Sequence, residues 1–190
     1  MADGVTRPKR ADAQRNQKAL LDAAAAVFVE AGVEAPVRDV AARAGVGTAT
    51  IYRHFPTRAD LIVAVYRHQV DALAEAGPAL LAAGGSPYTA LSSWIDQFVG
   101  FLVTKHGLAH VLQSSDACFD PLHDYFIERL VPVCGELLEA AAEAGEICPG
   151  QEAYEFMRGV GSICAGAGGA RHYDARHLVT LLVAGLRRAG

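Results

Sequence analysis

The stretch "DVAARAGVGTATIYRHFPTRADLI", residues 39–62, constrains the fold of this chain more than any other segment. Its apolar residues recur at spacings of three and four, typical of one face of a helix, on both sides of a turn with two glycines at residues 45–47. Pro56 prevents the second helix from continuing, and Thr57 followed by Asp60 predicts the start of a third. The stretch therefore predicts three helices joined by very short turns.

The rest of the chain shows helical periodicity as well, and we find no alternation typical of a strand. A helix over residues 12–31 precedes the stretch, and we expect Gly32 to end it. Beyond a helix at 57–76, which Gly77 and Pro78 should end or kink, the predicted helices cover residues 87–105, 107–115, 121–145, 150–167 and 174–189. This pattern predicts an all-α protein.

The predicted organisation has three parts. Residues 1–11 carry basic residues and no periodicity, and we expect a flexible basic arm there. Residues 12–56 form a three-helix N-terminal domain, and residues 57–190 form a larger helical domain whose connecting helix is 57–76.

Charge is unevenly distributed along the chain. The first 70 residues hold ten lysines and arginines against seven acidic residues, a net charge of +3, whereas the remaining residues carry a net charge of −7. This asymmetry indicates an anionic partner for the first third. The N-terminus has no apolar segment of a secretory signal, and no apolar run approaches the ~18 residues of a membrane helix, so we expect a cytoplasmic location and no membrane partner.

Two helices joined by a short glycine-containing turn form a helix-turn-helix, in which the second helix can enter the DNA major groove. Here the bracing helix covers residues 37–44, and the reading helix begins at Thr48. The outward residues of the reading helix are Thr48, Ala49, Thr50, Tyr52, Arg53 and His54. Arg58 and Arg38 each lie in the first turn of a helix, where a phosphate would be bound favourably. The alternative is that the pair of helices contacts only itself.

The segment "VRDVAARAGVGTATIYRHFPTRADLIVAVY", with "LLDAAAAVFVEAGVEA" before it, resembles the DNA-binding signature of the TetR-type (TetR/AcrR-like) transcriptional regulators over residues 19–66. The resemblance implies a homodimer with a DNA-binding domain and an all-α ligand-binding and dimerisation domain. It also implies repression at a palindromic DNA operator that a small-molecule effector releases. The implied DNA contacts are Thr48, Thr50, Tyr52, His54 and Arg58, with Arg38 as a further candidate and with Tyr52 and Arg58 on phosphates. Ala35-Pro36 replaces the family's usual N-cap hydroxyl, so a contact at the bracing helix is missing.

The larger domain offers candidates for the effector pocket and the dimer interface. Aromatic and apolar residues at helical spacing are typical of a core, and from them we select as pocket candidates Trp94, Phe98, Phe126 and Met157. Their apolar character suits a hydrophobic effector. The last helix carries an apolar stripe of Leu178, Leu181, Leu182 and Gly185. This stripe either closes the core or pairs with a second copy, and the resemblance favours pairing.

An alternative function is a small helical enzyme or metal-binding protein. His106 and His110 lie four residues apart, and Asp116, Cys118, His123 and Asp124 follow. We expect Gly107 to break the helix between the two histidines, and no activated nucleophile or paired carboxylates are evident. We therefore expect no enzyme, no metal and no cofactor. The sequence leaves open the effector, the operator, and activation as opposed to repression.

Overall fold

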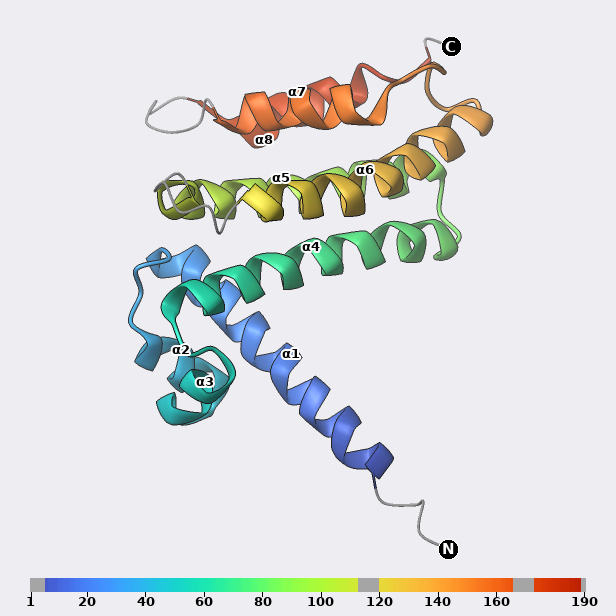
Figure 1. Cartoon of the computed structure of the whole chain (residues 1–190). Coiled ribbons are helices and arrows are strands. Elements are labelled where there is room, and N and C mark those ends of the chain that lie inside the picture. The colour runs from blue at the N-terminus through green and yellow to red at the C-terminus, as the bar shows by residue number, and fades with distance from the viewer. Residues whose placement is uncertain (1–5, 113–119, 166–172, 189–190) are drawn as a thin grey trace, which may run out of the picture. The chain divides into compact units, whose positions relative to one another are not determined.

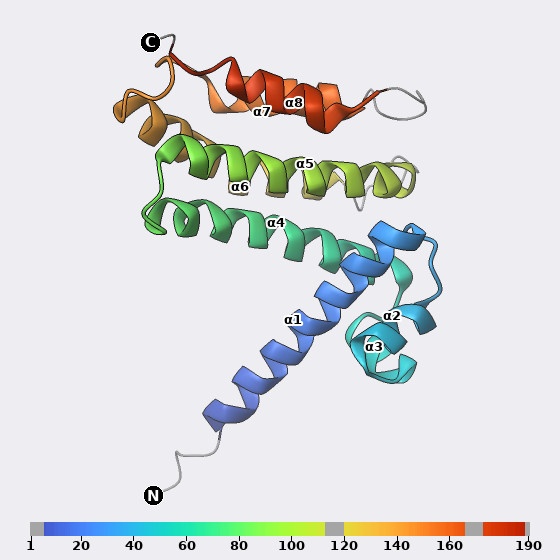
Figure 2. The ribbon, with the colours of Figure 1, turned by 180° about the vertical axis from the view of Figure 1, so that it is seen from behind.

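The computed structural model describes residues 6–112, 120–165 and 173–188, with side chains described for 15–102, 122–165 and 173–188. The described residues form eight helices, shown in Figures 1 and 2, which confirms the all-α prediction. The helices are α1 (Thr6–Ala31), α2 (Val37–Ala44), α3 (Thr48–His54), α4 (Arg58–Ala82), α5 (Pro87–Leu112), α6 (Asp120–Glu143), α7 (Ala153–Ala165) and α8 (Ala175–Ala184). None of these helices is long and apolar enough to cross a membrane.

The chain divides into two compact units inside α4, between Gln69 and Val70. The boundary expected from the sequence, at residue 56, lies earlier. The difference arises because the first turns of α4 are held within the N-terminal unit. His68 Nε2 lies 2.6 Å from Asp22 Oδ1 of α1, and the Arg58 guanidinium binds carbonyl groups that follow α1.

The N-terminal unit begins with α1, which starts at Thr6 although we expected a flexible arm up to residue 11. Pro8 is compatible with this position, because the first four N–H groups of a helix have no intrahelical acceptor and the missing proline donor costs nothing there. The helix ends as predicted at Gly32, which has a φ of 79° and donates its N–H to the Phe28 carbonyl at 3.1 Å.

In the C-terminal unit, α4 runs through Gly77 and Pro78 to Ala82, so the predicted end at residue 76 is wrong. A proline inside a helix removes one backbone hydrogen bond, and packing can offset that loss. Gly77 supplies such packing, because a Cβ atom at this position would overlap Cγ1 of Val133 in α6. The glycine therefore lets α4 and α6 approach closely.

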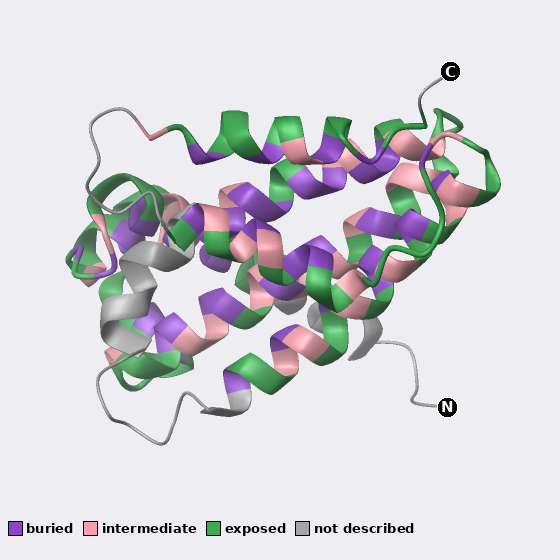
Figure 3. Ribbon diagram, turned by 90° about the horizontal axis from the view of Figure 1, so that it is seen from above, coloured by how far each residue is buried: buried purple, intermediate pink, exposed green. Residues whose placement is uncertain are grey.

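The predicted break at Gly107 is also wrong, because α5 is continuous from Pro87 to Leu112. The core of the C-terminal unit lies among the inward faces of its helices, where Figure 3 shows buried positions. Trp94 of α5 is fully buried, and its indole N–H donates to the Leu73 carbonyl of α4 at 2.8 Å. Ile147 and Arg187 form an isolated antiparallel bridge that joins the loop after α6 to the segment after α8.

Candidate DNA-binding surface and effector pocket

The segment from α2 to α3 has the predicted geometry. Gly45 ends α2 in the left-handed conformation with a φ of 67°, and the N–H of Val46 donates to the Ala41 carbonyl at 3.0 Å. Val40 of α2 and Ile51 of α3 are both buried, with exposed fractions of 0% and 1%. The two helices pack together with these apolar side chains buried, which leaves the opposite face of α3 in solvent.

The outward face of α3 carries side chains suited to DNA. Ala49 and Arg53 lie opposite buried Ile51, since successive residues of a helix are turned by about 100°. Thr48 and Tyr52 lie on one flank of this face, and Thr50 and His54 lie on the other. Tyr52 is 51% exposed, Thr48, Arg53 and His54 are exposed, and Thr50 is half-buried. Arg53 therefore joins the candidate residues at the centre of the face.

The start of α2 also matches the sequence analysis. Pro36 provides no side-chain hydrogen bond to the helix, which confirms the missing cap. Arg38 follows in the first turn, and its side chain is 79% exposed, with Nε 3.6 Å from Asp39 Oδ1. Its guanidinium is therefore accessible to an anion.

Arg58 lies in a different environment from the one we expected. Its Nη2 donates to the Ala35 carbonyl at 2.8 Å and to the Val33 carbonyl, and Nε lies 3.9 Å from Glu34 Oε2. The guanidinium thus joins α4 to the loop between α1 and α2. Helix position and the family resemblance together led us to expect a phosphate contact for this side chain, but neither shows which carbonyls lie nearby.

The start of α4 has the predicted capping pair. The Thr57 backbone N–H donates to Asp60 Oδ2 at 2.9 Å, and the Asp60 N–H donates to Thr57 Oγ1 at 3.1 Å. These reciprocal bonds satisfy N–H groups that the first turn leaves without an acceptor. They fix the start of α4 immediately after α3.

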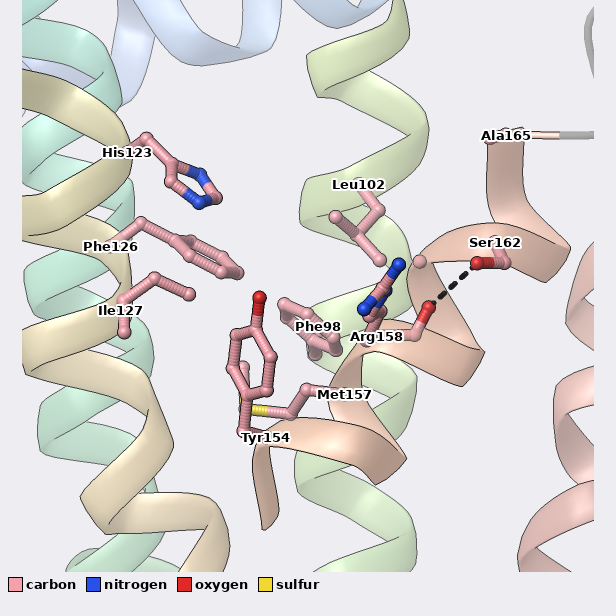
Figure 4. A pocket seen from close by; sticks show the side chains of 11 residues that line it. Phe98, Leu102, His123, Phe126, Ile127, Tyr154, Met157, Arg158, Ser162 and Ala165 are labelled. Carbon is pink, nitrogen blue, oxygen red and sulfur yellow. Dashed lines mark hydrogen bonds between the residues drawn. The ribbon is translucent and has the colours of Figure 1, made fainter. Parts of the chain in front are cut away.

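The C-terminal unit contains a cavity of ≈ 330 Å³ between α5, α6 and α7 (Figure 4). Three of the four predicted pocket residues line it: Phe98, Phe126 and Met157. Trp94 does not line the cavity. Its ring stacks against Phe98, with a distance of 5.6 Å between the ring centroids. Trp94 is therefore part of the core that supports the cavity-lining Phe98.

Aromatic rings form much of the cavity wall. Phe98 and Phe126 are stacked with centroids 5.9 Å apart, and the His123 ring stacks on Phe126 at 6.3 Å. The sequence analysis did not place His123 in the pocket and omitted Tyr154 and Arg158 of α7, which also line it. Two signals in the sequence could have found these residues. His123 lies three residues before Phe126, on the same helix face, and Tyr154 and Arg158 lie within one turn of Met157.

The apolar stripe on α8 is only partly buried within one chain. Leu178 and Leu181 are 38% and 55% exposed, Leu182 is half-buried and Gly185 is exposed. Val179 and Val183 of the same helix close the core instead. The stripe is therefore not the face that α8 uses to pack inside the unit.

The residues of the alternative metal or enzyme site largely lie outside the described side chains. This applies to His106, His110, Asp116 and Cys118, whereas His123 and Asp124 are described. Among the described residues, no group of three histidine, cysteine or acidic side chains is arranged to hold a metal ion. The alternative therefore stays a prediction.

Two family matches cover most of the chain. Residues 20–65 match the family described as "Bacterial regulatory proteins, tetR family", and residues 86–188 match "Transcriptional regulator SbtR-like, C-terminal domain". The second match spans the helices that surround the cavity. The helix-turn-helix and the helical C-terminal unit thus both have counterparts in one class of regulator.

Solved structures and curated relatives agree with these matches. The crystal structure of the TetR transcriptional regulator SCO0520 from Streptomyces coelicolor is 31% identical, has a TM-score of 0.77 and covers 92% of this chain and 99% of that one. A TetR regulatory protein from Mycobacterium vanbaalenii is also 31% identical, with a TM-score of 0.70 and coverage of 95% and 100%.

The transcriptional repressor LfrR of Mycolicibacterium smegmatis is 43% identical over 58 residues, 30% of each chain. The chain spans less than half the length of the curated relatives that it matches. The chain belongs to the TetR family of bacterial regulatory proteins.

Proposed function

We propose that this protein is a sequence-specific DNA-binding transcriptional regulator, acting in the cytoplasm as a homodimeric repressor that a small-molecule effector releases from a palindromic operator. The observation that carries the proposal is the outward face of α3, whose polar side chains are exposed while Ile51 on its opposite side is buried. A short helix with this division can enter the major groove without losing its packing.

Each candidate side chain has a proposed role. Thr48, Thr50 and His54 contact base edges or the backbone, Tyr52 and Arg38 contact phosphates, and Arg53 contacts a base edge or a phosphate. Arg58 acts indirectly, because its guanidinium is bound to carbonyl groups of its own domain. It positions the start of α4 beside α3.

The proposed dimer interface is the stripe of α8 with the adjoining face of α7. Exposed leucines such as Leu178 and Leu181 favour burial against a second copy, since exposed apolar patches are typical of protein interfaces. A two-fold symmetric dimer presents two α3 helices to successive major grooves, about 34 Å apart. The operator would then be an approximate palindrome.

The residue assignment is tested by fluorescence anisotropy with a DNA duplex selected by the protein itself. Tyr52→Ala should weaken binding about equally for all sequences, because it removes an uncharged phosphate contact, whereas Arg38→Ala should also reduce the dependence of affinity on salt concentration by about one phosphate contact. Val29→Ala is the control, because this apolar side chain of α1 is 59% exposed, comparable with the 51% of Tyr52, and does not lie on α3. Equal binding by Tyr52→Ala and the wild type would refute the assignment.

A further inference from the structure

The cavity between α5, α6 and α7 has an arginine at its edge whose charge is not neutralised by the described residues. Arg158 lines the cavity and is exposed, and no described residue forms an ion pair or hydrogen bond with its guanidinium. Two other arginines of the unit form ion pairs: Arg129 pairs with Asp71, and Arg176 pairs with Asp96. Arg158 is therefore available to a ligand.

Tyr154 is a second group of the cavity that can donate a hydrogen bond to a negative charge. Tyr154 lies one turn before Arg158, and Figure 4 shows its ring extending from α7 toward Phe126. Its hydroxyl has no hydrogen-bond partner among the described residues. The Ser162 hydroxyl donates to the Arg158 carbonyl at 2.9 Å, so its proton is already used. Among the residues whose side chains the structure describes, no aspartate or glutamate lines the cavity.

The rest of the lining is apolar and largely aromatic. The stacked rings of Phe98 and Phe126 form a wall, and Met157 is buried beside it. The faces of these two rings are occupied by Trp94, His123 and each other, so a planar ligand would meet their edges, an edge-to-face arrangement that aromatic groups also favour. The volume of ≈ 330 Å³ lies near the lower end of the range of about 300–1,000 Å³ for small-molecule pockets. The occupant is therefore small.

We propose that the effector of this protein is a small organic anion with a planar apolar body and one carboxylate, which pairs with Arg158 while the body packs against the edges of Phe98 and Phe126. Arg158 donates two parallel N–H bonds to the carboxylate oxygens, the geometry that a guanidinium fork favours. Tyr154 donates a further hydrogen bond. This inference rests on the proposed function, because it names the chemical class of the effector at the same site.

The experiment is isothermal titration of the full-length protein, without DNA, with 2-naphthoate and with the uncharged 2-naphthamide. The two compounds share a planar body and differ in charge. We expect naphthoate to bind about tenfold to a hundredfold more tightly, the range for a charge-assisted pair. Arg158→Gln should remove this preference and leave naphthamide affinity unchanged. Glu155→Gln, a charge change on the same helix outside the cavity lining, should keep it.

A second variant locates the binding site. Gly161 lines the cavity, and a Cβ atom there would meet no atom within 4 Å, so Gly161→Leu places a side chain in the open space without a clash at its Cβ. This variant should weaken the binding of both compounds. Equal affinities for the two compounds, a preference that survives Arg158→Gln, or no binding of either compound would each overturn the proposal.

Operator binding by the ligand-free protein is measured in parallel. Loss of naphthoate binding with intact operator binding refutes the effector class alone. Absence of operator binding with an intact carboxylate preference refutes the proposed regulator and leaves the pocket chemistry standing. The two failures are therefore distinguishable.

Discussion

The two units of this protein place their candidate functional groups in opposite environments. In the N-terminal unit the candidates stand on the solvent face of α3, a helix of seven residues, and their own contacts contribute little to packing. In the C-terminal unit the pocket residues Phe98, Phe126 and Met157 are buried members of the core, contributed by three different helices. Substitutions should therefore separate function from stability in the first unit and couple them in the second.

The largest expected effect concerns the dimer. Leu181→Glu places a charge on the exposed apolar stripe of α8, and we expect a monomer in sedimentation velocity. Operator affinity should fall by about a hundredfold or more, because two linked reading helices bind much more tightly than one. Val29→Glu is the matched control, since Val29 of α1 is 59% exposed and lies outside the stripe. A Leu181→Glu dimer would contradict the interface.

The second effect concerns Arg58, a candidate of the N-terminal unit whose substitution should change stability as well as DNA binding. Arg58→Ala removes a charged donor from the Val33 and Ala35 carbonyls and should lower the free energy of unfolding by about 1–3 kcal/mol. Tyr52→Ala should change it by less than about 0.5 kcal/mol. Urea unfolding measures both variants. If Arg58→Ala unfolds like the wild type and only the salt dependence of DNA binding changes, Arg58 is a phosphate contact, as the family resemblance implied.

A smaller effect tests the close packing of the C-terminal unit. Gly77→Ala forces a Cβ atom against Val133 and should destabilise the protein by about 1–2 kcal/mol, although alanine is the better helix former. The effect should shrink in a Val133→Ala background, because the colliding methyl group is absent there. A double-mutant cycle with thermal unfolding measures this coupling. An equal effect in both backgrounds would contradict the contact.

The last effect is absent at neutral pH and is a loss of stability at alkaline pH. Burial raises the pKa of the Cys134 thiol from 9.0 to about 12, and burial also raises the pKa of Tyr66. A raised pKa in the folded state means that stability is fully present below pH 9 and declines between pH 9 and pH 12. Cys134→Ala should reduce this decline, whereas Cys148→Ala, which changes an exposed thiol, should leave it unchanged. Urea unfolding at several pH values measures both, and identical slopes would contradict the prediction.

The sequence predicted features that depend on neighbouring residues better than features that depend on residues far apart in the chain. The turn at Gly45, the bounds of α3 and the capping pair of Thr57 and Asp60 depend on residues a few positions apart, and all were predicted correctly. The contacts of Arg58 involve carbonyls more than twenty residues away, and they were missed. The spacing of residues along the chain does not show which distant groups a side chain contacts in the folded protein.

In the C-terminal unit, most failures have a similar cause. Gly77 and Gly107 were expected to interrupt helices, but α4 and α5 continue through them. A glycine inside a helix costs only about 1 kcal/mol relative to alanine, and tertiary packing can offset that cost. Trp94 and Phe98 look alike as parts of an aromatic stripe, yet one lies behind the wall and the other lines the cavity. Only the arrangement of α5, α6 and α7 separates the two positions.

The most direct test of the central assignment, sequence-specific DNA reading by α3, is selection of bound sequences from a random DNA library by the purified protein at moderate salt. We expect enrichment of an approximate palindrome whose half-sites are one helical turn apart, and loss of the consensus on replacement of Thr50 and Arg53 with alanine. Binding that depends on salt without any enriched sequence would contradict it, because α3 would then contact only the DNA backbone.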